Sequence, residues 1–364
     1  MKIGKLLSAG SLLAAISTGV AVPATLTAAD NVSHVTPLVS QLGNRDAPNS
    51  GTVVGASPAP ASGSGPGTLA VWQPGERAAR SVVFGTANTT SGNSFYVASD
   101  RAIHSIFVPT FAGITYVVST YSWNVVGQFD SLTAGRVAKV TPNGKLVVIE
   151  SGTTTAAYQT TAPYSQVFLA PVGGNALVLS PNGKDAFVGG NADTNVAEIS
   201  MISGKQVATF PVSNSGDMVW ARGQVFSANI ATGVMSAINP ATGKIVSIAT
   251  PEVDPNFSYS DISAANAGFM QLSVSPGHRW IYAAGFSGHI LKFSALRDTY
   301  LGEVAVDANT AGANLLSGLV VLKGGKQAVV TVENLNESVV VSLKTGEIVR
   351  SASALASNRW INLR

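Results

Sequence analysis

The stretch "LSPNGKDAFVGGNADTNVAEISMISGKQVATF" (residues 179–210) holds two short turn motifs, "PNGK" and "SGK", between segments in which apolar residues alternate or run together. Short apolar runs bounded by glycine-containing turns are typical of β-strands, and the glycine accepts the positive φ that a tight reversal needs. The stretch therefore predicts four short strands, A to D, with tight turns that join A to B and C to D.

The same plan recurs along the chain. Residues 218–250, 272–306 and 319–351 repeat it, and weaker copies lie at 95–130 and 137–174. A spacing of about 40 residues with four strands per unit is the period of β-propeller blades. The sequence therefore predicts an all-β fold, a β-propeller of four-stranded antiparallel blades.

Two segments resemble a known repeat family. The residues "SPNGKDAFVGGN", with "VAEISMISGKQVATF" after them, and the segment "INPATGKIVSI" (residues 238–248) resemble the YVTN-type β-propeller repeat. The sequence departs from that pattern where "FVGG" stands in place of Y-V-T-N. The resemblance, over about residues 68–364, implies the propeller fold. It leaves function open, because the family includes surface, scaffold and binding proteins, and its relatives include lactonases and redox subunits.

The two ends of the repeat array are half units. Residues 68–84 resemble the C and D strands of a unit, and residues 353–364 resemble the A and B strands. Pairing these halves in one sheet would remove an open sheet edge. We therefore predict seven blades, closed by pairing of N- and C-terminal strands, with six as the alternative if residues 137–174 do not form a blade. We also expect the N-terminal segment to enter the closing blade on the side of the B–C connections.

The N-terminus has the layout of a secretory signal peptide. The cationic start "MKIGK" precedes an apolar run of small residues, and cleavage is expected after Ala29. A retained membrane anchor is the alternative, but the run is short and rich in Gly and Ser. Removing Lys2 and Lys5 from the 22 basic residues leaves 20 against 19 acidic ones, a net charge of +1. This balance gives no case for nucleic-acid binding. We expect a periplasmic or secreted protein with no transmembrane segment after signal removal.

Composition limits the chemistry of the remaining chain. There is no Cys among the 364 residues, which excludes disulfides, Cys-ligated zinc, a thiol nucleophile and covalently attached c-type haem. Residues 44–67 are rich in Gly, Pro, Ser and Ala, a composition typical of flexible linkers. The expected organisation is a signal peptide at 1–29, a flexible N-terminal segment and linker at 30–67, and the propeller domain at 68–364.

Antiparallel strands place the A–B and C–D turns on one face of the ring, called here the turn face, and the B–C and D–A connections on the other, called the loop face. The turns are short and uniform, whereas the loop-face connections vary, and the longest spans residues 251–268. Long loops around a channel mouth commonly bind ligands. The expected ligand-binding residues are Asp217, at the start of an inner strand, and Asp254, Tyr259, Asp261 and His289, in loops.

The sequence allows a metal-binding or catalytic role without assigning one. Asp and Asn are frequent on the expected loop face; their oxygens suit Ca²⁺, but these residues also cap turns and accept positive φ. Only His289 of the four histidines belongs to this face, which disfavours a multi-His metal site. No Ser stands in a G-x-S-x-G setting with a following Asp and His.

The sequence predicts an exported binding or scaffolding protein that recognises a protein, a cell-surface polysaccharide or a small ligand on the loop face. One alternative is a metal-dependent propeller enzyme of the lactonase or hydrolase class. Another is a redox partner subunit with a non-covalent cofactor. Stoichiometric bound metal would favour the enzyme over the binding protein.

Overall fold

The structure, a computed structural model, describes residues 52–57, 67–73, 79–85, 96–100, 103–190, 193–229, 232–253, 268–307, 315–335, 337–352 and 361–363. The chain divides into two compact units, 1–44 and 45–364, and every described residue belongs to the second. The expected signal peptide lies outside the described residues. In the described ranges, no helix has the length and apolar character needed to cross a bilayer.

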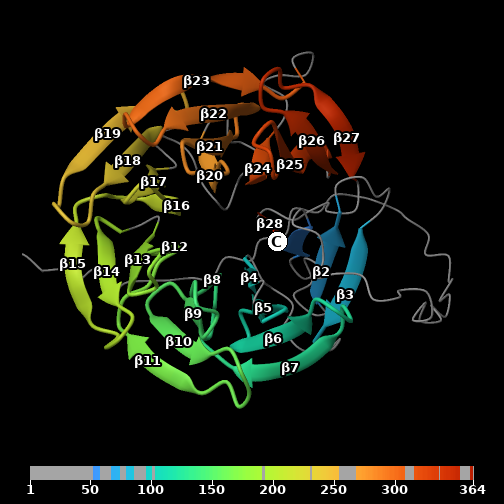
Figure 1. The fold of residues 1–364 in the computed structure, drawn as a ribbon, viewed down its shortest axis with the longest axis vertical. Coiled ribbons are helices and arrows are strands. Elements are labelled where there is room, and N and C mark those ends of the chain that lie inside the picture. The colour runs from blue at the N-terminus through green and yellow to red at the C-terminus, as the bar shows by residue number, and fades with distance from the viewer. Residues whose placement is uncertain are drawn as a thin grey trace, which may run out of the picture. The chain divides into compact units, whose positions relative to one another are not determined.

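The second unit is a ring of seven sheets, each of four antiparallel strands, and it confirms the predicted seven-bladed β-propeller (Figure 1). We number the blades in chain order and letter the strands A to D from the channel outward. Blade 1 contains β28 (Asn362–Leu363), β1 (Val53–Ser57), β2 (Gly67–Trp72) and β3 (Arg80–Phe84). Blade 2 contains β4 (Ala98–Asp100), β5 (Ser105–Pro109), β6 (Ile114–Ser119) and β7 (Val125–Asp130).

Each of the remaining five blades consists of four strands that are consecutive in the sequence. Blade 3 contains β8 (Val137–Val140), β9 (Leu146–Glu150), β10 (Thr155–Gln159) and β11 (Gln166–Ala170). Blade 4 contains β12 (Ala176–Leu179), β13 (Asp185–Gly189), β14 (Val196–Ser200) and β15 (Gln206–Phe210). Blade 5 contains β16 (Ser215–Ala221), β17 (Gln224–Asn229), β18 (Val234–Ile238) and β19 (Ile245–Ala249). Blade 6 contains β20 (Phe269–Val274), β21 (Trp280–Gly285), β22 (His289–Ser294) and β23 (Thr299–Ala305). Blade 7 contains β24 (Leu316–Val321), β25 (Gln327–Val332), the short 3₁₀ helix η3 (Glu333–Leu335), β26 (Glu337–Ser342) and β27 (Ile348–Ala352).

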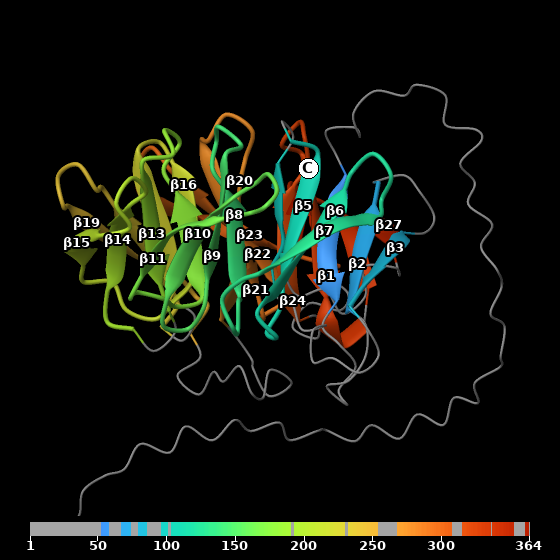
Figure 2. The ribbon, with the colours of Figure 1, turned by 90° about the horizontal axis from the view of Figure 1, so that it is seen from below.

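Seen edge-on, the strands run between the two faces of the ring (Figure 2). The turns that first indicated the fold have one geometry in several blades. In blade 4 the Gly183 amide donates to the Ser180 carbonyl at 2.9 Å, and Gly183 has a φ of 67°. Blade 3 repeats this bond between Gly144 and Thr141 at 2.8 Å. The repeated "PNGK" motif therefore predicted the A–B turn correctly, because only a positive-φ residue closes it without strain.

The closing blade differs from the prediction in how the two ends share it. Three of its strands come from the N-terminal side and only the innermost strand, β28, comes from the C-terminal side. β1 pairs with β28 through Val53–Leu363 and Val54–Asn362. This places a strand inside the range expected to be a linker, so the propeller begins before residue 68. The Gly- and Pro-rich surroundings concealed the short apolar pair Val53 and Val54, which are fully buried.

The position of β1 also corrects the expected point of entry. As a B strand, β1 starts at the end of the blade where the A–B turns lie. The chain therefore enters the propeller at the turn face, and not on the side of the B–C connections.

The weak repeat at residues 137–174 is a complete blade, which removes the six-blade alternative. Its strand C is Thr155–Gln159 and its strand D is Gln166–Ala170. The B–C connection is therefore short, and Tyr164 lies in the C–D turn, on the turn face.

The core lies between adjacent blades. One buried cluster joins blade 5 to blade 6 through Phe226, Phe269 and Phe293, all with no exposed surface. Burying one such side chain contributes about 1.5–3 kcal/mol, so these interblade contacts supply much of the stability of a ring that has no disulfide. The A strands are the innermost strands and surround the centre of the ring (Figure 1).

Candidate functional site

The inner strand of blade 5 carries Asp217, the first of the predicted site residues. A β-bulge between Ser215 and Asp217 turns this carboxylate toward the neighbouring blade, where its Oδ2 accepts a hydrogen bond from the Leu272 amide at 2.8 Å. The side chain is only 3% exposed. Burial raises the pKa of Asp217 to about 6, although the positive charge of Lys139 and the amides of Leu272 and Met218 act in the opposite direction. Asp217 lies on an inner strand as predicted, and the structure uses it to join blade 5 to blade 6.

Gln271 makes the equivalent connection one blade further along the ring. Its Oε1 accepts hydrogen bonds from the Leu319 amide at 3.0 Å and from the Ile361 amide at 3.1 Å. Its Nε2 donates to the Ile361 carbonyl at 2.6 Å. A bulge between Phe269 and Leu272 presents this buried amide. Gln271 thus links blade 6 both to blade 7 and to the segment that leads into β28.

Tyr96 and Lys139 form a second polar group on the inner side of the blades, near Asp217 and Gln271. Lys139 Nζ donates to the Tyr96 hydroxyl at 2.6 Å. Burial raises the pKa of Tyr96, the charge of Lys139 lowers it and the charge of Asp217 raises it. These four side chains come from blades 2, 3, 5 and 6. Of these four residues only Asp217 was predicted, although a long polar side chain in a mostly apolar inner strand marks Lys139 and Gln271 equally well.

His289 belongs to a separate network on the loop face. Its Nδ1 lies 3.0 Å from Ser287 Oγ, and that hydroxyl donates to Glu252 Oε1. The other carboxylate oxygen of Glu252 accepts the Gly268 amide at 2.8 Å. Glu252 and Gly268 flank residues 254–267, so this carboxylate ties the two ends of the longest loop together. Ser287 lies between the acid and the imidazole, which is not the order of a hydrolase triad, where histidine stands in the middle.

Burial has the largest effect on the pKa of Glu252, which lies where the longest loop begins. Glu252 is 1% exposed, and burial raises the pKa of its carboxyl group, while the bonds from Ser287 and Gly268 lower it. Gly285 packs closely against it, because a Cβ there would lie 2.5 Å from Glu252 Oε1 and would displace that carboxylate. The predicted residues Asp254, Tyr259 and Asp261 lie outside the described residues. The structure places Asp217 and His289 in different networks and does not bring them together.

A groove of about 400 Å³ opens on the loop face between blades 3 and 4. Its walls come from the B–C connection of blade 3, the link between the two blades, and the B–C connection and outer strand β15 of blade 4. Most of its polar side chains carry hydroxyl or amide groups, and one carries a carboxylate: Thr153, Asp193, Thr194, Asn195, Gln206 and Thr209. Partial burial raises the pKa of Asp193.

Glycines hold these connections in close contact. A Cβ on Gly173 would lie 2.3 Å from the Ser151 carbonyl oxygen, and one on Gly174 would lie 2.1 Å from the Gly189 carbonyl oxygen. A Cβ on Gly190 would lie 2.6 Å from Asp193 Oδ2. The backbone around the groove is therefore fixed by packing that no other residue type allows, so the groove is preformed. The "GGN" sequence at residues 173–175 was the available signal for it.

A buried carboxylate, Glu150, and a half-buried arginine, Arg136, lie behind the groove. Glu150 has no exposed surface, and neither of its carboxylate oxygens has a hydrogen-bond partner within the described residues. Burial raises the pKa of Glu150 well above its usual value, and nearby Arg136 lowers it. The Gly174 amide lies near this carboxylate but donates to the Ser151 carbonyl at 2.9 Å. Arg136 in turn donates to Asn175 Oδ1 and packs behind Gly152, which lines the groove.

A metal site of the kind that a lactonase-like enzyme would need was an open possibility. In the part of the chain that the structure describes, no three His, Asp or Glu side chains lie together where they could hold a metal ion. The predicted Ca²⁺ possibility stays a prediction, since three of the candidate loop residues lie outside that part.

Among the comparisons with known proteins, only the one with solved structures finds a likeness, and that likeness concerns the fold. No family model matches the chain, and no curated protein matches its sequence, so the resemblance to YVTN-type repeats stays a prediction. The structure matches 1702 chains of solved structures. One of them is hydrazine synthase of Kuenenia stuttgartiensis, with a TM-score of 0.57 and 11% identity, over 69% of this chain and 76% of that chain. At that identity the likeness shows a β-propeller architecture alone.

Proposed function

We propose that this protein is an exported binding module that holds a neutral, hydroxyl-rich ligand, a segment of a cell-surface polysaccharide, in the groove between blades 3 and 4. The observation that carries this proposal is a preformed groove in which hydroxyl, amide and carboxylate groups converge on a fixed backbone. Preformed concave sites with a few convergent polar groups are typical of ligand binding, because little ordering entropy is lost when the ligand enters.

The polar groups of the groove suit sugar hydroxyls. Asp193 can accept two hydroxyl hydrogen bonds, and a charged acceptor makes bonds roughly twice as strong as a neutral one. Thr209, Asn195 and Gln206 offer both donors and acceptors. The lining contains no Lys or Arg, so an anionic ligand would meet only the negative charge of Asp193. Export is supported by the cationic and apolar start of the chain.

Binding of neutral oligosaccharides to the purified protein, measured by titration calorimetry across a panel of glucans, mannans and galactans, tests the proposal. Asp193→Asn keeps the shape of the side chain and removes its charge. We expect it to weaken binding about tenfold, because a hydrogen bond to a charged group contributes about 1.5–3 kcal/mol. Asp130→Asn, at an exposed position on the outer strand of blade 2, is the matched control and should bind as the parent does.

The pH dependence of binding gives a second test. The pKa of Asp193 is raised, so this carboxyl group gains a proton at a higher pH than an ordinary aspartate. Affinity for the bound glycan should therefore fall as the pH decreases through that raised pKa, and Asp193→Asn should abolish the dependence. A panel in which no neutral glycan binds, or in which Asp193→Asn binds unchanged, would reject the groove as the site.

A further inference from the structure

The turn face of the ring is basic. Each of blades 3 to 7 places exposed lysine or arginine residues in its A–B or C–D turns: Lys145, Lys184, Lys205, Arg222, Lys244, Arg279, Arg297, Lys323, Lys326 and Lys344. The acids at the same ends of these blades are Asp185, Asp298 and Glu347. The common position of the basic residues gives one face of a nearly neutral protein a positive field, which attracts anions.

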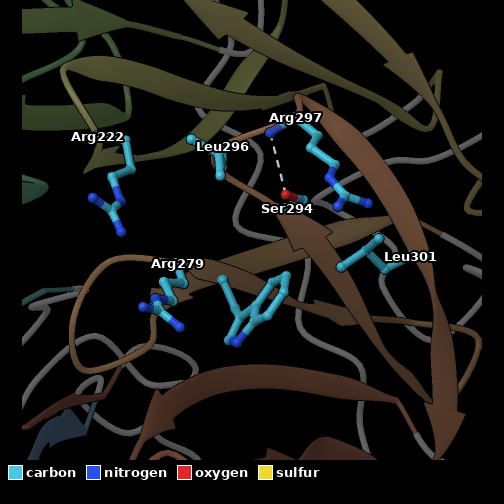
Figure 3. Close-up of a pocket in the computed structure, with 7 residues that line it drawn as sticks. Arg222, Arg279, Ser294, Leu296, Arg297 and Leu301 are labelled. Atoms are coloured by element: carbon cyan, nitrogen blue, oxygen red, sulfur yellow. Dashed lines mark hydrogen bonds between the residues drawn. The ribbon is translucent and has the colours of Figure 1, made fainter.

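Three of these cations surround a single pocket. A cavity of about 280 Å³ lies at the turn-face end of blade 6. It is lined by Arg279 from the A–B turn of that blade, by Arg297 from its C–D turn and by Arg222 from the A–B turn of blade 5. In Figure 3 the three arginine side chains come from separate turns and lie around one opening. The Arg297 amide donates to Ser294 Oγ at 3.2 Å, which fixes the backbone of that turn.

None of the three guanidinium groups forms an ion pair with a carboxylate within the described ranges. The acid beside them in sequence, Asp298, accepts a hydrogen bond from Gln224 Nε2 at 3.1 Å. Like charges held around one cavity repel one another, and an anion in the cavity would relieve that repulsion. Guanidinium groups also match carboxylates in geometry, with two parallel N–H groups for the two oxygens.

The backbone at Arg222 is unfavourable for this residue type. The two-residue turn between β16 and β17 consists of Arg222 at a φ of 52° and Gly223 at a φ of 81°. Such turns favour Asn or Asp with Gly, and a long side chain at positive φ costs about 1 kcal/mol. Here the turn presents its guanidinium to the pocket.

The rest of the pocket is apolar and accessible. Leu296 is 75% exposed and Leu301 is 44% exposed, and both line the cavity with the half-buried indole of Trp280. Lys292, which does not line the cavity, lies beside that indole with its Nζ 4.5 Å from the ring centroid. A bare inorganic anion would leave the indole and the leucines unused. The pocket therefore fits a ligand that carries a carboxylate on a ring with an apolar face.

We propose that the turn face binds an acidic polysaccharide, and that one uronic-acid residue of the chain occupies the pocket formed by Arg222, Arg279 and Arg297. The carboxylate lies among the guanidinium groups, and the carbon-bound hydrogens of the pyranose ring pack on Trp280 and Leu296. The volume is slightly below the range of drug-sized ligand sites, so it accommodates one sugar ring. The basic turns of the neighbouring blades then attract the following carboxylates of the polymer. This site lies on the face opposite the groove and does not depend on the function proposed for that groove.

The probe for this site is a short oligogalacturonate, with its fully methyl-esterified form as the uncharged match. We expect the acid to bind and the ester to bind at least about tenfold more weakly. Arg279→Gln should cost about tenfold in affinity, and the triple change of Arg222, Arg279 and Arg297 to Gln should remove binding. Arg279→Lys keeps the charge but loses the paired donors, so it should retain only part of the affinity.

A matched triple variant, Lys145→Gln with Lys184→Gln and Lys205→Gln, removes the same charge from the same face but outside the pocket. It should lower affinity less than about threefold, as distant exposed charges do under salt screening. Leu296→Ser tests the apolar wall and should weaken binding without changing the melting temperature, because the side chain is 75% exposed. Asp193→Asn should leave oligogalacturonate binding unchanged, which separates this site from the groove.

Three results would overturn the proposal. One is equal binding of the acid and its methyl ester. Another is equal loss of binding in the two triple variants, which would mean diffuse attraction without a pocket. The third is binding of phosphatidylglycerol vesicles or single-stranded DNA as tight as that of oligogalacturonate, with the same dependence on the three arginines, which would identify a general polyanion surface.

Discussion

Gln271 and Ile361 are joined by two hydrogen bonds between the side-chain amide of one and the backbone of the other, at 2.6 Å and 3.1 Å. Both residues are buried, and they are 90 positions apart in the chain. A third bond from the Leu319 amide uses the same oxygen. One side chain therefore satisfies three backbone groups from the inner strand of blade 7 and from the segment that leads into β28.

Replacing this amide should be costly. Gln271→Leu keeps the size but leaves those three buried backbone groups without partners. Each unsatisfied group costs about 1–3 kcal/mol, so we expect the free energy of unfolding to fall by about 3 kcal/mol or more. Chemical denaturation measures the change. Gln128→Leu, on the exposed outer strand of blade 2, is the control and should stay within about 0.5 kcal/mol of the parent. Equal effects of the two changes would contradict this role for Gln271.

Removing residues 358–364 should open the ring. The deletion takes away β28 and the fully buried Ile361, and it leaves the inner edge of β1 unpaired. An unpaired edge in a sheet invites association with other chains, so we expect a lower melting temperature and aggregation. Calorimetry and light scattering follow the two effects. Unchanged melting of the truncated protein would show that β28 does not hold the ring closed.

The buried carboxyl group of Asp217 should make stability depend on pH. Its pKa in the folded protein is about 6, above the usual 3.8, so the folded state holds more protons than the unfolded state between those values. Protonated Asp217 therefore contributes to the free energy of unfolding at low pH, and this contribution is lost as the pH rises through about 6. The difference in unfolding free energy between Asp217→Asn and the parent should grow from pH 4 to pH 8 by up to about 3 kcal/mol in favour of the variant. Parallel pH curves for parent and variant would refute this.

The glycines behind the groove should tolerate no side chain. Gly174→Ala places a Cβ 2.1 Å from the Gly189 carbonyl oxygen, so the backbone must move. Gly243→Ala meets no atom within 4 Å and costs only the strain of its φ of 71°, about 1–2 kcal/mol. We expect Gly174→Ala to cost more than Gly243→Ala in denaturation experiments, and to weaken glycan binding as well. Similar losses for the two variants would mean that the contact at Gly174 relaxes freely.

Export can be tested directly. Mass spectrometry of the protein recovered from the periplasm or medium should show an N-terminus near Asp30. An exported protein that retains Met1 would contradict cleavage of a signal peptide.

Repeats explain why the sequence predicted the fold so well. The residues that form the turns of a blade lie within that blade, as in the Ser180–Gly183 turn, so the pattern can be recognised within about 40 residues. The closure was predicted only in outline, because β1 is a five-residue strand in a stretch rich in Gly, Pro and Ser. Nothing local distinguishes Val53 and Val54 from a linker; their burial depends on partners at the other end of the chain.

The sites were harder to predict because they form between blades. Asp217 was assigned to an inner strand, as observed, but its bulge and its bond to Leu272 depend on the neighbouring blade. The pocket at the turn-face end of blade 6 needs Arg222 from blade 5, about 60 residues before Arg279. The sequence already placed the turns on one face, but the ligand site was predicted on the other face because the connections there are longer and more variable.

The shared first blade has a consequence for biogenesis. Six blades are each built from consecutive strands and can form as the chain emerges, whereas blade 1 waits for residues 361–363. Until then β1 presents an unsatisfied ladder edge and the ring remains an open arc. The interval between synthesis of β1 and of β28 covers nearly the whole propeller, and throughout it the nascent chain needs protection from association with other chains. A protein closed in this way is best kept unfolded until its last strand is available, which is the state in which a secretion channel would receive it.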